Sequence, residues 1–242
     1  MKYGLVSDVG KIRKINEDSC YICEDGVCPY IMVADGMGGH QAGEVASMMA
    51  VDIIGNHLAK YLHEGLEYVE AAEIVRRAFI DANSIIYDYA NTHYKIMGMG
   101  TTTTFSMIYD DKLITAHVGD SRAYAIDGYS IRQITRDHSY VQELVEMGRL
   151  SPGEAKTNPK KNFITRAMGA EKTVKTDIII EPYIGEKILL CSDGLSNLVE
   201  DDEIFNAVKY SGSLQKAAEE LRDLANSRGG TDNITAVIMS RN

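Results

Sequence analysis

Four short acidic motifs lie at widely separated points of this 242-residue chain, each at the end of an apolar run. In every motif an aspartate stands beside a small residue or an amide. The motifs are Val33-Ala34-Asp35-Gly36, His117-Val118-Gly119-Asp120, Cys191-Ser192-Asp193-Gly194 and Thr231-Asp232-Asn233. Aspartates at the mouths of buried strands can converge in space, and converging carboxylates repel one another unless a cation lies between them. The pattern therefore predicts a hard-metal site, which typically acts on phosphate or water.

Length and composition suit a globular protein with a substantial core. The 242 residues are enough for one large domain or two small ones, and 45% of them are apolar. The net charge of −10 argues against binding nucleic acid through a basic face. No run reaches the roughly 18 apolar residues that span a bilayer, and the first residues do not resemble a signal peptide. We therefore expect a cytoplasmic protein that does not insert into membranes.

Cys20 and Cys23 form a C-x-x-C motif with Cys28 nearby, which raises the alternative of a zinc or redox site. No second cysteine pair and no spaced histidines complete such a site. Residues three apart on a strand also point to opposite faces of the sheet. We interpret these cysteines as structural, and Cys191 as a strand-end residue without a catalytic role.

Hydrophobic periodicity divides the chain into groups of strands and pairs of helices. Strands are expected near 1–7, 18–24, 29–34, 101–109, 112–118, 122–126, 130–134, 176–182, 186–191 and 231–239. Helices are expected near 41–63, 68–93, 201–210 and 213–227. The strands between 101 and 134 should form a meander, and Ile74, Ala78, Ile85 and Tyr89 should form the inner stripe of the second helix. This organisation indicates an α+β fold with packed sheets and outer helices.

The segment from about 140 to 165 interrupts the strand pattern. It carries Gly148, Pro152, Gly153 and Pro159. Loops held on a rigid scaffold commonly decide specificity. We therefore expect a mobile flap beside the metal site that tunes substrate choice.

Each acidic motif on its own also has a purely structural interpretation. Asp35 precedes a glycine-rich stretch at 36–39, which could bring a carbonyl close to a metal ion or simply cap the next helix. Asp120 and Asp232 could be acceptors in Asx-type turns. The other charged candidates, for which a solvated strand end or loop is the alternative, are Glu17, Asp18 and Arg13. Several motifs that can converge favour the metal site over these separate explanations.

Eight sequence blocks occur in an order and spacing that identify a family. They are SDVGKIRKINEDS, VADGMGGHQAGEVAS, GMGTTTTF, AHVGDSRAY, ITRDHS, ITRAMG, LLCSDGLS and GGTDNITAV. Over nearly its whole length the chain resembles the metal-dependent protein serine/threonine phosphatases of type 2C, the PPM family, in their short bacterial form. The resemblance implies a four-layer α/β/β/α sandwich, with two central antiparallel sheets flanked by helix pairs. It also implies a single phosphatase domain over residues 1–242, with the flap as an insertion.

The resemblance assigns metal-binding roles to the acidic motifs. Asp35 should bridge two ions, and the Gly36 carbonyl should bind one of them. Asp193 and Asp232 should complete the other site, while Asp120 with Asp193 matches a weaker third site. The ions should be Mn2+ or Mg2+, since both favour oxygen ligands.

The resemblance also implies how the reaction proceeds. Glu17 and Asp18 should hold metal-bound waters, and Arg13 should grip the substrate phosphate as a planar fork. A hydroxide that bridges the ions would attack the phosphorus of phosphoserine or phosphothreonine. Eukaryotic members commonly have a histidine, the proposed general acid, where this chain has Met37. A metal-bound water or His40 would then supply the proton, although a place at the start of a helix is the preferred interpretation of His40.

The sequence argues against three other functions. A catalytically silent relative that binds a partner usually lacks an aspartate, whereas Asp35, Asp193 and Asp232 are all present. A phosphatase of a dedicated switch pathway usually carries extra sensory domains, and a kinase would need a phosphate-binding glycine loop with its lysine. The expected partners are phosphoproteins and an opposing serine/threonine kinase, with the enzyme a monomer. His117 and His138 are expected to be packing or turn residues.

Overall fold

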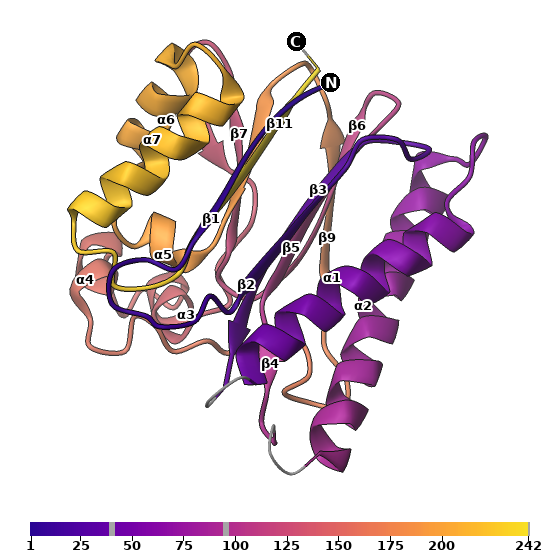
Figure 1. The fold of residues 1–242 in the computed structure, drawn as a ribbon, viewed down its shortest axis with the longest axis horizontal. Coiled ribbons are helices and arrows are strands. Elements are labelled where there is room, and N and C mark those ends of the chain that lie inside the picture. The colour runs from indigo at the N-terminus through magenta and orange to yellow at the C-terminus, as the bar shows by residue number, and fades with distance from the viewer. Residues whose placement is uncertain (39–41, 94–96, 242) are drawn as a thin grey trace.

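The architecture is a sandwich of two antiparallel sheets between two helix pairs (Figure 1). The computed structural model describes residues 1–38, 42–93 and 97–241. In spatial order, the first sheet consists of β1 (Lys2–Asp8), β11 (Ile234–Ser240), β10 (Lys187–Cys191), β7 (Arg122–Ile126) and β8 (Ile131–Gln133). The second consists of β2 (Asp18–Cys23), β3 (Tyr30–Met37), β5 (Thr103–Tyr109), β6 (Lys112–Val118) and β9 (Asp177–Pro182), with β4 (Gly100–Thr101) beside β3. The four layers and the α+β class are as the sequence predicts.

Helices cover the outer face of each sheet. The second sheet is covered by α1 (Ala42–Tyr61) and α2 (Tyr68–Thr92), and the first by α6 (Asp201–Tyr210) and α7 (Leu214–Ser227). Three short helices lie toward one end of the sandwich (Figure 1): α3 (Tyr140–Glu146), α4 (Pro152–Thr157) and α5 (Asp193–Ser196). Within the described ranges, no helix combines the length and the hydropathy that a membrane span requires.

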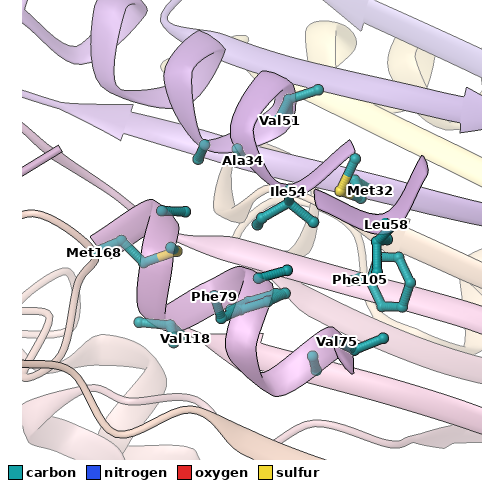
Figure 2. Close-up of a cluster of buried hydrophobic side chains, with 14 of the residues drawn as sticks. Met32, Ala34, Val51, Ile54, Leu58, Val75, Phe79, Phe105, Val118 and Met168 are labelled. Atoms are coloured by element: carbon teal, nitrogen blue, oxygen red, sulfur yellow. The ribbon is translucent and has the colours of Figure 1, made fainter. Parts of the chain in front are cut away.

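Strand alternation explains why both faces of each sheet are apolar. Met32 of β3 packs toward the helices, whereas its neighbours Ile31 and Val33 pack between the two sheets. Figure 2 shows the helix-side cluster, in which Ile54 of α1 and Phe79 of α2 pack with residues of the sheet such as Phe105. A strand buried on both faces appears in the sequence as a continuous apolar run, which precedes Asp35, Asp120 and Asp193 and follows Asp232.

One part of the predicted helix stripe was wrong. Ile85 is 47% exposed and Tyr89 37% exposed, so neither belongs to the core. The inner face of α2 instead contains Val75, Phe79, Ala82, Ile86 and Ala90, together with Ala78. Ile85 and Tyr89 each lie one residue, or about 100° around the helix, from the buried positions Ile86 and Ala90. Ile85 is apolar like a core residue, but it lies on a different face of the helix.

The strands between 101 and 134 do not form one meander. β5 and β6 pair in the second sheet, whereas β7 and β8 pair in the first. The chain changes sheets at Gly119, where φ is +115° and an added Cβ would lie 2.5 Å from Thr102. Asp120 lies on this connection and is buried instead of lying in a surface turn.

The segment near 140–165 contains two capped helices where the sequence indicated only an irregular insertion. Ser139 caps α3 and Ser151 caps α4 through hydrogen bonds to backbone N–H groups. The ends of the segment are joined, since Ser139 pairs with Ile164 in a β-bridge and Thr165 N donates to the His138 carbonyl at 2.8 Å. Its mobility and its effect on substrate choice stay predictions.

Candidate metal centre

Five aspartates from both sheets converge at one end of the sandwich. Asp35 lies within β3, opposite Asp18 of β2 in the strand register. Asp120 follows β6, Asp193 opens α5 and Asp232 precedes β11. Burial, followed by the negative charges of the other four aspartates, raises the pKa of Asp35 well above its ordinary value. The acidic motifs of the sequence therefore meet in one place, and Asp18 joins them.

Asp193 and Asp35 lie close enough for their carboxyl groups to affect each other's ionisation. Burial and then Asp232 raise the pKa of Asp193 to about 6, while a hydrogen bond with Asp35 lowers it. A hydrogen bond between two carboxyl groups needs a shared proton. Burial likewise raises the pKa of Asp18 to about 7 and that of Asp120 well above its usual range. Without a compensating cation, only protonation of the carboxylates can relieve the repulsion between their negative charges.

Glycines allow the backbone segments of the site to approach closely. An added Cβ on Gly36 would lie 2.1 Å from the Gly43 carbonyl oxygen, so the end of β3 packs against the first turn of α1. An added Cβ on Gly194 would lie 2.0 Å from the Asn233 carbonyl oxygen. Gly36 also donates its N–H to the Glu17 carbonyl at 3.1 Å, and β3 continues to Met37 instead of ending before Asp35. Gly36 is therefore part of a strand and not of a capping turn.

Several buried oxygens at the site have no hydrogen-bond partner among the described residues. They are Glu17 Oε1, Asp18 Oδ1 and Asp120 Oδ1. The other oxygen of Asp18 accepts hydrogen bonds from Ser192 Oγ at 2.8 Å and Thr235 Oγ1 at 2.7 Å. Unpartnered buried acceptors are costly, and they suit a hard cation that takes oxygen ligands. The donor set therefore fits Mn2+ or Mg2+.

The part of the chain that the structure describes does not provide a closed cage for such an ion. Among the described residues, no three His, Cys, Asp or Glu side chains already form the ligand set of one ion. Mg2+ usually takes only one or two carboxylates and keeps several of its waters. The arrangement therefore fits a largely hydrated ion.

Asn233, which sequence reasoning did not single out, fixes the loop that carries Arg13. Its Nδ2 donates to the carbonyls of Val9 and Ile15, both at 3.0 Å, and its Oδ1 accepts from Glu17 N at 2.8 Å. Arg13 Nη2 donates to Asp232 Oδ2 at 2.7 Å, and the arginine side chain is 47% exposed. Arg13 therefore lies at the rim of the carboxylate cluster. The position of Asn233 directly after Asp232 was the available sequence signal.

His117 and His138 make hydrogen bonds to neighbouring segments of the chain, which gives them structural roles. His117 is buried between Thr104 Oγ1 and the Arg136 carbonyl, and burial lowers its pKa to about 3. His138 Nδ1 accepts from Gly119 N at 2.9 Å, and its Nε2 lies 3.1 Å from Asp177 Oδ2. His40 lies outside the described residues.

Burial raises the pKa of Cys191 to about 12, so its thiol is not ionised at neutral pH.

The raised carboxyl pKa values predict an unusual stability profile. The folded, metal-free protein should bind more protons than the unfolded chain as pH rises from about 4 to 7, so its stability should fall over that range. Asp18→Asn should remove part of this dependence, because Asp18 titrates near 7. We expect the melting temperature of chelator-treated wild type to fall by about 5 °C more than that of Asp18→Asn between pH 5 and 8, at about 2–4 °C per kcal/mol.

Thermal melts of both proteins at several pH values check this expectation. The buried histidines act in the opposite sense below about pH 6.5, but they are common to both proteins and cancel in the comparison. Saturating Mn2+ should abolish the difference in slope. Parallel profiles for the two chelator-treated proteins would contradict the assigned pKa of Asp18.

A two-sheet sandwich with a carboxylate cluster at one end defines a class of metal-assisted hydrolase. The sequence model of the family "Protein phosphatase 2C" matches residues 12–227. The chain therefore belongs to the protein phosphatase 2C family.

Individual relatives extend this match over nearly the whole chain. The serine/threonine phosphatase stp of Listeria welshimeri is 39% identical over 241 residues, covering 98% of this chain and 94% of the relative. The crystal structure of the serine/threonine phosphatase Stp1 from Staphylococcus aureus is 34% identical with a TM-score of 0.94, covering 100% of this chain and 95% of Stp1. The catalytic domain of the serine/threonine phosphatase PstP in complex with two manganese ions is 36% identical with a TM-score of 0.83, over 98% and 96% of the two chains.

Proposed function

We propose that this protein is a metal-dependent phosphatase that hydrolyses phosphoserine and phosphothreonine in proteins. The observation that carries the proposal is the cluster of five aspartates with unpartnered buried oxygens, in a chain of the protein phosphatase 2C family. All residues from 1 to 242 would form one catalytic domain. Phosphate release from a phosphothreonine peptide, with and without added manganese, tests it.

Each acidic residue has a proposed role around the ions. Asp35, at the centre of the cluster, would bind two core ions, with the Gly36 carbonyl on one of them. Asp193 and Asp232 would complete the core, and Asp120 with Asp193 would hold a weaker third ion. When bound, Mn2+ or Mg2+ would acidify a water and so supply a nucleophile near neutral pH.

The residues of the outer part of the site would orient water and substrate. Ser192 and Thr235 donate to one oxygen of Asp18, so its second oxygen, which has no partner among the described residues, would be available to accept a hydrogen bond from a metal-bound water. Glu17 has the same capacity through its unpartnered Oε1. With His117 and His138 in structural roles, water and His40 are the proton sources left for the departing serine or threonine oxygen.

Arg13→Ala should raise the KM for a phosphothreonine peptide by about tenfold and lower kcat by much less. Charge-assisted hydrogen bonds contribute about 1.5–3 kcal/mol, and part of that is lost to solvent at a half-exposed side chain. Arg13 would hold phosphate equally in the ground state and the transition state, which changes KM and not kcat. Steady-state kinetics at saturating Mn2+ measure both constants. A loss of kcat at unchanged KM would instead assign Arg13 to the transition state.

The biological setting follows from the proposed reaction. The substrates would be phosphoproteins, and a serine/threonine kinase of the same cell would oppose the enzyme. We propose that it acts in the cytoplasm as a monomer. The presence of Asp35, Asp193 and Asp232 favours an enzyme over a silent relative that only binds partners.

A further inference from the structure

The position of the Asp120 carboxyl group depends on the backbone that carries it. Asp120 is buried, and its Oδ1 has no hydrogen-bond partner among the described residues. It lies on the connection between β6 and β7, where the chain changes sheets. A carboxylate that few neighbours hold can meet an ion only where its backbone places it, so the contacts of this connection matter for metal binding.

Two hydrogen bonds attach the Gly119 peptide to His138. Gly119 N donates to His138 Nδ1 at 2.9 Å, and His138 N donates to the Gly119 carbonyl at 2.7 Å. The residue before His138 holds the other end of the connection, since Asp137 forms a fork with Arg122, whose Nη2 lies 2.7 Å from one carboxylate oxygen. Asp120 therefore lies between two residues that the dipeptide Asp137-His138 holds in place.

The contact with Gly119 determines which nitrogen of the His138 ring carries the proton. A backbone N–H can only donate, so Nδ1 is the acceptor and the proton of the neutral ring lies on Nε2. Nε2 then donates to Asp177 Oδ2 at 3.1 Å. Arg166 Nη1 lies 2.8 Å from Nε2, but its acceptors are Asp177 Oδ1 at 2.9 Å and the Lys175 carbonyl at 3.2 Å. Burial lowers the pKa of His138, which keeps the ring neutral.

We propose that His138 is a positioning residue, which holds the Gly119 peptide through Nδ1 and so places the Asp120 carboxylate for the weaker third ion. The proposal rests on the proposed function, because that function assigns this ion to Asp120. Asp177 would fix the orientation of the ring from its far side. Loss of the Nδ1 contact should therefore weaken the third ion and leave the core ions bound, whereas loss of the Asp177 contact should have a smaller effect.

Two substitutions separate the two sides of the ring. In His138→Asn, Oδ1 takes nearly the place of Nδ1 and can still accept from Gly119, but the shorter side chain does not reach Asp177. In His138→Gln, the amide extends to the place of Nε2 and can still reach Asp177, but nothing accepts the Gly119 N–H. Asp177→Asn is a matched control, because it changes the far side of the ring and leaves the Nδ1 contact in place.

Hydrogen exchange and manganese binding measure the effect without turnover. In the metal-free protein, the Gly119 amide should exchange about tenfold faster in His138→Gln than in wild type, and within about twofold of wild type in His138→Asn. In calorimetric titrations with Mn2+, His138→Gln should weaken the third ion by about tenfold or more and change the core affinity by less than about twofold. His138→Asn and Asp177→Asn should keep both affinities within about threefold of wild type.

Three outcomes would overturn the proposal. Equal losses of the third ion in His138→Asn and His138→Gln would indicate that the ring acts by filling space. Equal weakening of the core ions and the third ion would indicate a general loss of structure. A long-range 1H–15N NMR correlation that places the ring proton on Nδ1 would contradict the Gly119 contact in the unsubstituted protein, without any variant.

Failure of the proposed function gives a different result. A wild type that binds the core ions and the third ion but does not hydrolyse a phosphothreonine peptide would refute the proposed function and leave the role of His138 standing. A wild type that binds no third ion would overturn this proposal and the third ion together.

Discussion

Asparagine in place of Asp35 should lower kcat for a phosphothreonine peptide by roughly three orders of magnitude. Asp35 lies at the centre of the cluster, where burial and four neighbouring aspartates act on it. A carboxylate that holds the ions determines where the nucleophile forms, and metal ions contribute several kcal/mol of transition-state stabilisation, with each 1.36 kcal/mol worth tenfold in rate. Steady-state kinetics and manganese titration of the variant measure the loss.

A folding defect can be separated from this loss of function. In the chelator-treated protein, Asp35→Asn removes a carboxyl group that is costly to ionise, so the melting temperature should stay equal or rise.

Asp193→Asn should lose turnover to a similar degree, whereas Asp120→Asn should keep the core ions because its site is the weaker one. Near-normal turnover and metal binding in Asp35→Asn would remove Asp35 from the core, and loss of the core ions in Asp120→Asn would contradict the weaker third site.

Treatment with a chelator should abolish phosphopeptide hydrolysis, by at least about a hundredfold, and added Mn2+ or Mg2+ should restore it. The oxygens of Glu17, Asp18 and Asp120 that have no partner among the described residues suit oxygen-seeking ions. The same ions should stabilise the fold. At a concentration about one hundred times the dissociation constant, binding adds about 2.7 kcal/mol, or about 5–10 °C in melting temperature.

Phosphopeptide hydrolysis and the melting temperature, both measured after metal removal, serve as controls for each other. A thermal shift without recovery of activity would indicate that ions bind but do not assemble a reaction centre. Undiminished hydrolysis in metal-free, chelator-treated protein would contradict the two-metal mechanism outright. Replacement of an aspartate outside the cluster, such as Asp127 in its exposed turn, should change neither readout.

Local sequence signals predicted most of the elements, because each depends on neighbours in the chain. The bounds of β6, β7 and α6 coincide with the predicted ranges, since clear turns or charged residues end them. The stripe of α2 was displaced by one residue because an exposed isoleucine and a buried one have the same local pattern. The helices of the flap were missed because Pro152 and Gly153 indicate irregular structure, although proline is well suited to the first turn of a helix.

The sequence by itself determined the order of strands and helices, the apolar runs that place aspartates at strand ends, and the family blocks that name the candidate ligands. Only the tertiary structure decided which of these residues meet. The change of sheets at Gly119 brings Asp120 to the cluster, and Asn233 holds the Arg13 loop. These placements depend on contacts between residues that are far apart in the chain, from 17 positions for Gly119 and Thr102 to 224 for Asn233 and Val9, and no local pattern of hydrophobicity or charge encodes them.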